Sequence, residues 1–128
     1  MIKLYFRIGI VCLFLLFPLA LISSEDASGV PEKPANLKVT ETDAAANSLT
    51  LTWEPVPGAT GYYVYQGLLN RINQGWTRWR TTTPDPITTA TVVVRRVTLN
   101  TNYLYRVTAY NDSGEGAPSD YIEVNITR

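Results

Sequence analysis

The chain has 128 residues, 45% of them hydrophobic, and its 11 basic and 11 acidic residues give a formal net charge of zero. This length suits one domain with a core of its own, and the balanced charge argues against a general nucleic-acid binder. The sequence contains no histidine, no phosphate-binding glycine loop and no cluster with metal-ligand spacing. We therefore expect neither an enzyme nor a cofactor.

Residues 1–24 have the pattern of a secretory signal peptide. Two basic residues, Lys3 and Arg7, precede an uncharged and mostly apolar run over residues 8–22. That run is shorter than the roughly 20 residues that span a bilayer, and it contains Pro18. We expect cleavage at the end of this segment and a secreted, extracellular protein that does not contact the membrane. The alternative is a membrane anchor formed by uncleaved residues 8–22.

Seven short strands are expected after a flexible segment over residues 25–33, within a folded domain over residues 34–128. Apolar and polar residues alternate in these runs, as at Leu49, Leu51 and Trp53, which is the period of a strand with one buried face. Turn-forming residues separate the runs, and this pattern predicts an all-β, seven-stranded antiparallel sandwich. The expected strands lie at residues 37–39, 49–53, 62–66, 76–82, 91–95, 103–110 and 121–126.

The motifs resemble those of a fibronectin type III domain. An immunoglobulin domain would place cysteines on its second and sixth strands and a tryptophan on its third. Here the tryptophan, Trp53, is on the second expected strand, and both cysteines are missing. The motifs that carry the resemblance occur in order as Pro34-Ala35-Asn36-Leu37-Lys38-Val39, Leu49-Thr50-Leu51-Thr52-Trp53-Glu54-Pro55, Gly61-Tyr62-Tyr63-Val64, Tyr103-Leu104-Tyr105-Arg106-Val107-Thr108-Ala109-Tyr110-Asn111 and Gly114-Glu115-Gly116-Ala117-Pro118-Ser119.

The resemblance implies an immunoglobulin-like sandwich and assigns four structural residues. Trp53 and Tyr62 would lie in the core between the sheets. Tyr103 would form a tyrosine corner, in which the phenol bonds to backbone a few residues upstream, with Val97 beneath that loop. The resemblance also implies a non-catalytic module for protein binding or adhesion. The adhesion tripeptide Arg-Gly-Asp is absent, so that specialised function is not implied.

The segment over residues 71–96 is the charge-biased region of the sequence, with five arginines and one acidic residue. Trp76, Arg78, Trp79 and Arg80 form a candidate binding face there, because arginine and tryptophan are enriched at binding hot spots. Such a face would suit an anionic glycan or an acidic protein patch. The alternative is that the tryptophans pack against the sheet while the arginines keep the strands soluble.

Two loops form the other candidate binding surface, and the resemblance implies that they lie near one another. The two carboxylates of the loop over residues 111–116 are fewer than the six or more oxygens that calcium takes, so we expect no metal site. The candidate residues are Pro57 and Gly58 in the loop over residues 54–60, and Asp112, Gly114 and Glu115 in the loop over residues 111–116.

Two triplets, beginning at Asn111 and Asn125, match the N-glycosylation signal. Taken together, the sequence predicts a secreted monomer whose partner is an extracellular protein or glycan, and it does not identify that partner. Two alternatives stay open. One is a carbohydrate- or matrix-associated accessory protein that binds anionic glycan through the Arg/Trp face, and the other is a purely structural spacer.

Overall fold

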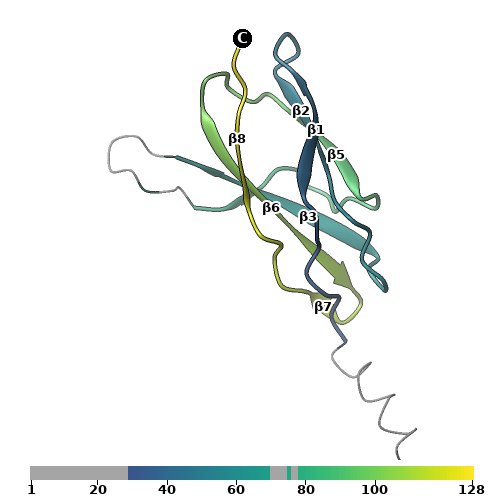
Figure 1. Cartoon of the computed structure of the whole chain (residues 1–128). Helices are drawn as coiled ribbons and strands as arrows, with labels where there is room; N and C mark the ends of the chain where they lie inside the picture. The colour runs from purple at the N-terminus through teal and green to yellow at the C-terminus, as the bar shows by residue number, and fades with distance from the viewer. Residues whose placement is uncertain (1–28, 70–74, 76–77) are drawn as a thin grey trace, which may run out of the picture.

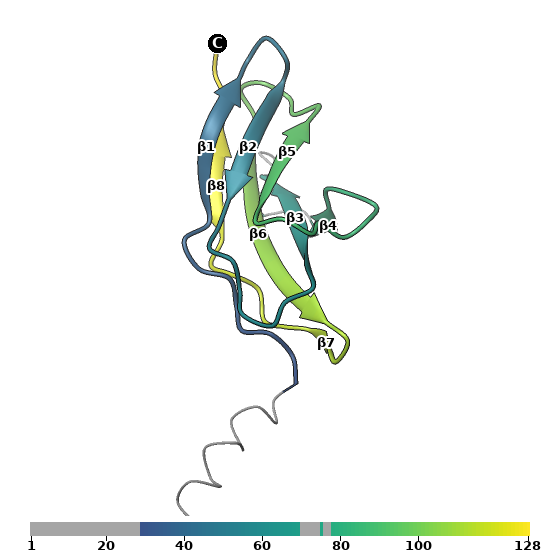
Figure 2. The same cartoon turned by 90° about the vertical axis from the view of Figure 1, so that its right-hand side faces the viewer.

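The computed structural model describes residues 29–69, 75 and 78–128, and this part of the chain forms two antiparallel β-sheets packed face to face (Figure 1, Figure 2). The predicted all-β sandwich is therefore confirmed. One sheet has the order β1-β2-β5 and consists of β1 (Lys38–Asp43), β2 (Ser48–Thr52) and β5 (Thr91–Arg95). The other has the order β4-β3-β6-β7, with β8 also paired to β6, and consists of β4 (Arg80–Thr81), β3 (Gly61–Leu68), β6 (Asn102–Asn111), β7 (Gly114–Glu115) and β8 (Ile122–Asn125).

The observed strands differ from the predicted ones in four places. Strand β1 runs to Asp43, beyond the end expected at residue 39, because it keeps pairing with β2. The strand expected over residues 76–82 is reduced, among its described residues, to β4, which pairs with only two residues of β3; residues 76 and 77 lie outside the described part. Strand β3 continues to Leu68, beyond the end expected at residue 66, because its last residues keep pairing with β6. The two-residue strand β7 completes a hairpin after β6 and was not predicted.

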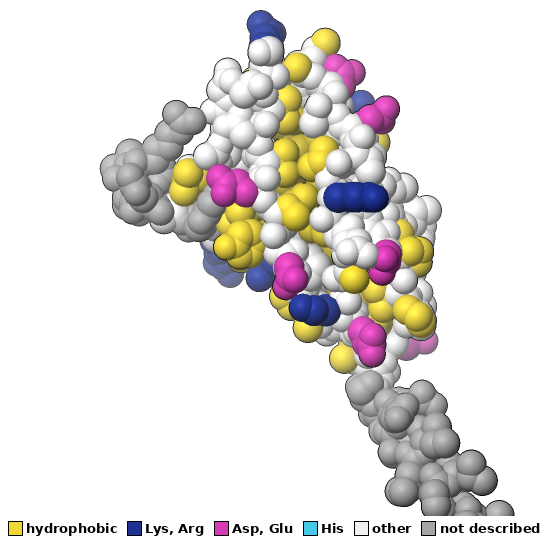
Figure 3. Space-filling model, in the orientation of Figure 1, with side chains coloured by type: hydrophobic (Ala, Val, Ile, Leu, Met, Phe, Trp, Pro, Cys, Tyr) yellow, Lys and Arg dark blue, Asp and Glu magenta, His cyan; other side chains and the backbone are white. Residues whose placement is uncertain are grey.

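One face of the domain mixes charged with apolar side chains. The face in view in Figure 3 carries single acidic and basic side chains spread among hydrophobic ones. No helix of the described residues is long and apolar enough to cross a membrane. The described chain starts at the end of the sandwich near β7, and the C-terminus lies at the opposite end (Figure 1).

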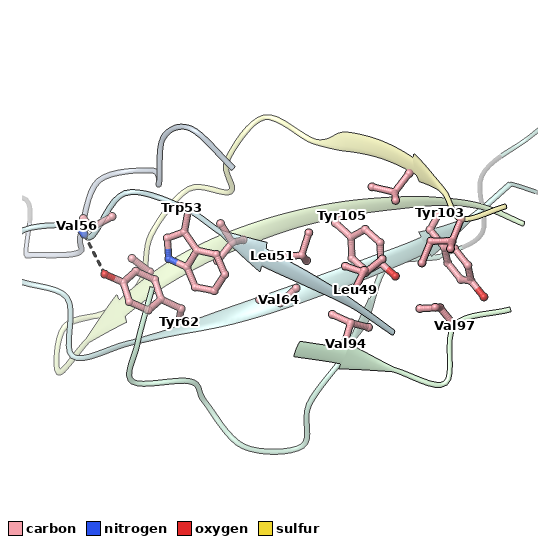
Figure 4. Close-up of a cluster of buried hydrophobic side chains, with 14 residues drawn as sticks. Leu49, Leu51, Trp53, Val56, Tyr62, Val64, Val94, Val97, Tyr103 and Tyr105 are labelled. Atoms are coloured by element: carbon pink, nitrogen blue, oxygen red, sulfur yellow. Dashed lines mark hydrogen bonds between the residues drawn. The ribbon is translucent and has the colours of Figure 1, made fainter. Parts of the chain in front are cut away.

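The core fills the space between the two sheets, and its side chains lie in a row from Trp53 to Tyr103 (Figure 4). The Trp53 and Tyr62 rings meet edge to face, with centroids 5.3 Å apart. The Tyr62 hydroxyl accepts a hydrogen bond from the backbone N–H of Val56 at 2.9 Å, which ties the loop between β2 and β3 to the core. Trp53 and Tyr62 are therefore core residues, as the resemblance implied.

Tyr103 holds the other end of the core. Its hydroxyl oxygen accepts a hydrogen bond from the backbone N–H of Thr98 at 2.8 Å, five residues upstream, and Val97 is buried beneath the same turn. This is the geometry of a tyrosine corner, which closes the connection between β5 and β6.

The segment before β1 packs against the hairpin end of the sandwich. Residues 29–33 fall in the segment that the sequence predicts to be flexible, yet Pro31 is buried in the structure. A Cβ atom at Gly116 would lie 2.1 Å from the carbonyl oxygen of Pro31, so glycine is needed for this close approach. The ammonium of Lys33 lies 3.4 Å from the Asp120 carboxylate.

Candidate binding surfaces

The predicted Arg/Trp face is divided between two sides of the sheet. Arg80 pairs with Gln66, which is on the same face of β3 as the core residues Tyr62 and Val64. Thr81 pairs with Tyr65, which lies on the outer face. Trp79 is half-buried on the outer side, where the Arg106 guanidinium lies 4.3 Å from the centre of its ring.

Arg78 and Arg80 are exposed and line a groove of about 310 Å³. The other walls of this groove are Gln66, Leu68 and two threonines of the β4 region. The groove therefore offers amide, hydroxyl and guanidinium donors but does not include Trp79. Trp76, the fourth residue of the predicted face, lies outside the described residues.

Arg106 is a functional candidate that the sequence reasoning did not select. Its guanidinium lies over the Trp79 ring and also 5.6 Å from the centre of the Tyr65 ring. The alternation of β6 places Arg106 on the outer face, but only the folded sheet brings Trp79 and Tyr65 from other strands to meet it. The three side chains form one stack on the outside of the sheet.

Glu115 belongs to the same outer face and is not a free loop carboxylate. It lies in β7, and its carboxylate accepts hydrogen bonds from the Tyr65 hydroxyl at 2.6 Å and the Thr108 hydroxyl at 2.5 Å. Burial, together with the hydrogen bond and the negative charge of Glu115, raises the pKa of Tyr65 to about 12. The carboxylate therefore serves to organise the sheet face.

The two candidate loops meet at one end of the sandwich. The backbone N–H of Thr60 donates to the carbonyl of Tyr110 at 2.8 Å, which joins the end of the first loop to the start of the second. Pro57 and Gly58 are exposed at the tip of the first loop. Gly58 has a φ of 78°, a conformation that glycine adopts without strain.

The second loop is held at its root. The Asn111 carboxamide oxygen accepts from the N–H of Ser113 at 2.8 Å, and its nitrogen donates to the carbonyl of Gly29 at 2.6 Å. Asp112 is exposed at the tip, and Gly114 has a φ of 134°, which other residues rarely adopt. The loop is therefore an ordered turn with a short exposed tip.

The two glycosylation triplets lie in different surroundings. Asn111 is partly buried, and its carboxamide nitrogen and oxygen are both used in the hydrogen bonds to Gly29 and Ser113. Asn125 is exposed on β8, and its carboxamide nitrogen donates to the carboxamide oxygen of Asn102 on β6. Among the described residues there is no group of three or more histidine, cysteine, aspartate or glutamate side chains that could hold a metal ion.

Comparisons with known proteins agree with this architecture. A family model described as "Fibronectin type III domain" matches residues 32–125. Similar curated proteins include a titin homolog of Caenorhabditis elegans, 35% identical over 79% of this chain, and mouse myosin-binding protein H, 33% identical over 76%. Human Roundabout homolog 2 is 32% identical over 73% of this chain. The chain spans only 1%, 21% and 7% of these three relatives.

Solved structures show the same fold. The FN5 domain of Drosophila Lar has a TM-score of 0.60 at 24% identity, and the alignment covers 77% of this chain and 99% of that one. Domains A168–A170 of titin have a TM-score of 0.62 at 25% identity, covering 77% of this chain and 33% of that one.

Proposed function

Because the chain belongs to the fibronectin type III family, we propose that its domain over residues 34–128 works as a non-catalytic protein-binding module outside the cell, in extracellular recognition or adhesion. The observation that carries this proposal is the backbone hydrogen bond from Thr60 to Tyr110, which brings two exposed loops together at one end of the sandwich. Loops on such a scaffold are the usual place for recognition residues.

The loops are suited to binding because they are already ordered. The first is tied to the core through the Tyr62 hydroxyl, and the second is tied to Gly29, in the segment before β1, through the carboxamide of Asn111. A partner would therefore lose little affinity to the ordering of these loops. Pro57, Gly58 and Asp112 are exposed between the tethered positions and would make the contacts.

The extracellular part of the proposal is supported by residues 1–24, where a basic start and an apolar run have the pattern of a signal peptide. Expression of the full chain in a secreting host tests it directly. The proposal expects protein in the medium with a mass that lacks this segment. Retention of the uncut chain in the membrane fraction would support the anchor instead.

Capture of extracellular proteins from the chain's own source, followed by mass spectrometry, tests loop recognition. Substituting both Pro57→Arg and Asp112→Arg is expected to remove the captured partner, because both positions are exposed at the loop tips. Ala46→Arg is the matched control, since residue 46 is exposed in the turn between β1 and β2 at the other end (Figure 2). Equal capture by both variants would contradict the loop assignment.

A second candidate, binding of an anionic glycan, is favoured by the groove that Arg78 and Arg80 line. It expects retention on heparin at low salt, where surface charge attraction is little screened. Exchange of both arginines for alanine is expected to abolish this retention, because it removes the positive charges of the groove. Retention that survives the exchange would exclude this groove as the glycan site.

A further inference from the structure

Strand β5 has a free edge. Among the described residues it pairs with β2 alone, from Ser48 opposite Arg95 to Thr52 opposite Thr91. Figure 1 and Figure 2 both show β5 at the margin of its sheet. An unpaired strand edge presents a row of N–H and C=O groups that can pair with another chain.

The register identifies the backbone groups on that edge. The N–H of Trp53 donates to the carbonyl of Ala90 at 3.1 Å, so this pair is of the hydrogen-bonded kind. Hydrogen-bonded and non-hydrogen-bonded pairs alternate along an antiparallel ladder, which directs the backbone groups of Val92 and Val94 toward β2. Those of Thr91, Val93 and Arg95 therefore point away from the sheet.

The side chains of the same three residues suit an added strand. Val93 is 46% exposed at the centre of β5, between the exposed side chains of Thr91 and Arg95. Threonine and valine are among the residues that pair best across strands, and β5 contains neither proline nor glycine. The backbone groups of Val93 and Arg95 on this edge are thus open, whereas the Thr91 carbonyl accepts a hydrogen bond from the Thr89 hydroxyl at 3.1 Å.

Charge on this side of the molecule indicates the kind of partner. Over residues 78–96 there are four arginines and one acidic residue, Asp85. Arg95 and Arg96 are exposed at the end of β5, and Arg78 and Arg80 are exposed near β4, the edge strand of the other sheet. Opposite charges across a strand pair are stabilising and like charges are destabilising.

Acidic residues near Arg95 do not cancel the preference of this edge for an acidic partner. Glu41 and Asp43 line a surface groove together with Val93 and Arg95, but they belong to β1, on the far side of β2. A strand added to β5 would lie three strand spacings from β1, or about 14 Å. That distance exceeds the Debye length of about 8 Å at physiological salt, so repulsion from β1 is largely screened.

We propose that the free edge of β5 binds an extended acidic segment of a partner protein, which adds to the sheet as an antiparallel strand. Carboxylates of the segment would lie opposite Arg95 and an apolar residue opposite Val93. The proposal rests on the protein-binding function above and names the chemistry of the partner. A second copy of this chain is a poorer occupant, because it would bring a second set of the same arginines to the edge.

The test uses the full secreted chain and three short synthetic peptides, with affinity measured by fluorescence anisotropy. The first peptide repeats Val-Thr-Glu-Thr, so that its valine and glutamate share one face and can lie opposite Val93 and Arg95. The second replaces each glutamate with lysine, and the third repeats the first with the backbone nitrogens of its valines and glutamates methylated. Only the first can offer both carboxylates and a complete hydrogen-bonding edge. We expect it to bind about tenfold more tightly than either of the others.

Val93→Pro tests the edge on the protein side. It removes an outward N–H and no bond to β2, and proline is tolerated at such positions of edge strands. We expect about tenfold weaker binding of the glutamate peptide, with an unchanged melting temperature. Val93→Thr is the matched control, because it keeps the N–H and the branched shape. Arg95→Glu is expected to reverse the preference toward the lysine peptide.

Several outcomes would overturn the proposal. Equal binding of the methylated peptide would exclude strand addition, and equal binding of the lysine peptide would exclude charge selection. Concentration-dependent dimerisation that Val93→Pro abolishes would assign the edge to a second copy, and binding of heparin alone would assign the arginines to a glycan. If Val93→Pro fails to fold, the methylated peptide decides. A captured partner lost with the loop variant but kept with Val93→Pro would leave the proposed function standing and reject this inference.

Discussion

Three buried tyrosines of β3 and β6 show how much depends on a single hydroxyl. Those of Tyr62 and Tyr103 each accept a backbone N–H and thereby hold a loop to the core. The hydroxyl of Tyr105 is buried, and among the described residues it has no hydrogen-bond partner. Burial and the neighbouring Tyr103 raise the pKa of Tyr105, so its phenol stays neutral. The tyrosine hydroxyl thus holds a loop at two positions, and at the third it is a buried polar group without a partner among the described residues.

Two exchanges to phenylalanine separate these roles. Tyr103→Phe is expected to lower the free energy of unfolding by about 1 kcal/mol, because the N–H of Thr98 loses its acceptor. Tyr105→Phe is expected to leave that free energy unchanged or raise it by about 1 kcal/mol, because it removes an unpaired buried hydroxyl. Urea denaturation of both variants measures the difference. Equal losses at the two positions would contradict the tyrosine corner.

Tyr65 makes the outer sheet face sensitive to high pH. Its pKa is raised from 10.0 to about 12 in the folded protein, so the neutral phenol is favoured by folding. This contribution to stability is complete below pH 10 and is lost as the pH rises through about 12. Glu115→Gln is expected to bring the pKa of Tyr65 down, because it removes the negative charge. Titration of the tyrosine ring by NMR measures the shift, and an unchanged pKa would show that burial alone sets it.

At the scale of the strands, alternation predicted β6 well and β4 poorly. Tyr103, Tyr105 and Val107 belong to the core cluster, as the alternation indicated, but Leu104 on the opposite face is also buried, at 3% exposure. The run over residues 76–82 is rich in residues that favour strands, yet a strand also needs a partner. Among the described residues, only Arg80–Thr81 finds one on β3. Pairing depends on the course of the neighbouring strand, which local sequence does not contain.

The contact between the segment before β1 and the β7 hairpin gives a prediction at this scale. Gly116→Ala is expected to lower the free energy of unfolding by about 2 kcal/mol, because the new methyl group would meet the carbonyl of Pro31 and force the two segments apart. Thermal denaturation measures the loss. Ala117→Ser is the control, since residue 117 is exposed. A stable Gly116→Ala variant would show that residues 29–31 do not add to the stability of the domain.

At the scale of the whole molecule, the sandwich and its core followed from the sequence, whereas the binding surfaces followed only in part. The ordered motifs fixed Trp53, Tyr62 and Tyr103 in roles that the structure reproduces. The Arg/Trp face did not stay together, because adjacent residues of an extended strand point to opposite sides. Arg106 meets Trp79 only through tertiary packing. A recognition surface contains residues from several strands, and the sequence pattern of one strand does not show which residues of the other strands lie beside it.

The placement of the two described ends bears on how the domain would respond to mechanical load. The chain enters at the β7 end and leaves at the opposite end (Figure 1). Tension between these ends would run along the strands, so that the bonds joining β1 to β2 and β8 to β6 lie across the pulling direction. Such bonds are sheared together rather than unzipped in sequence. Forced unfolding is governed by the unfolding barrier, and a domain loaded in this way would act as a stiff link up to the force at which the whole ladder fails.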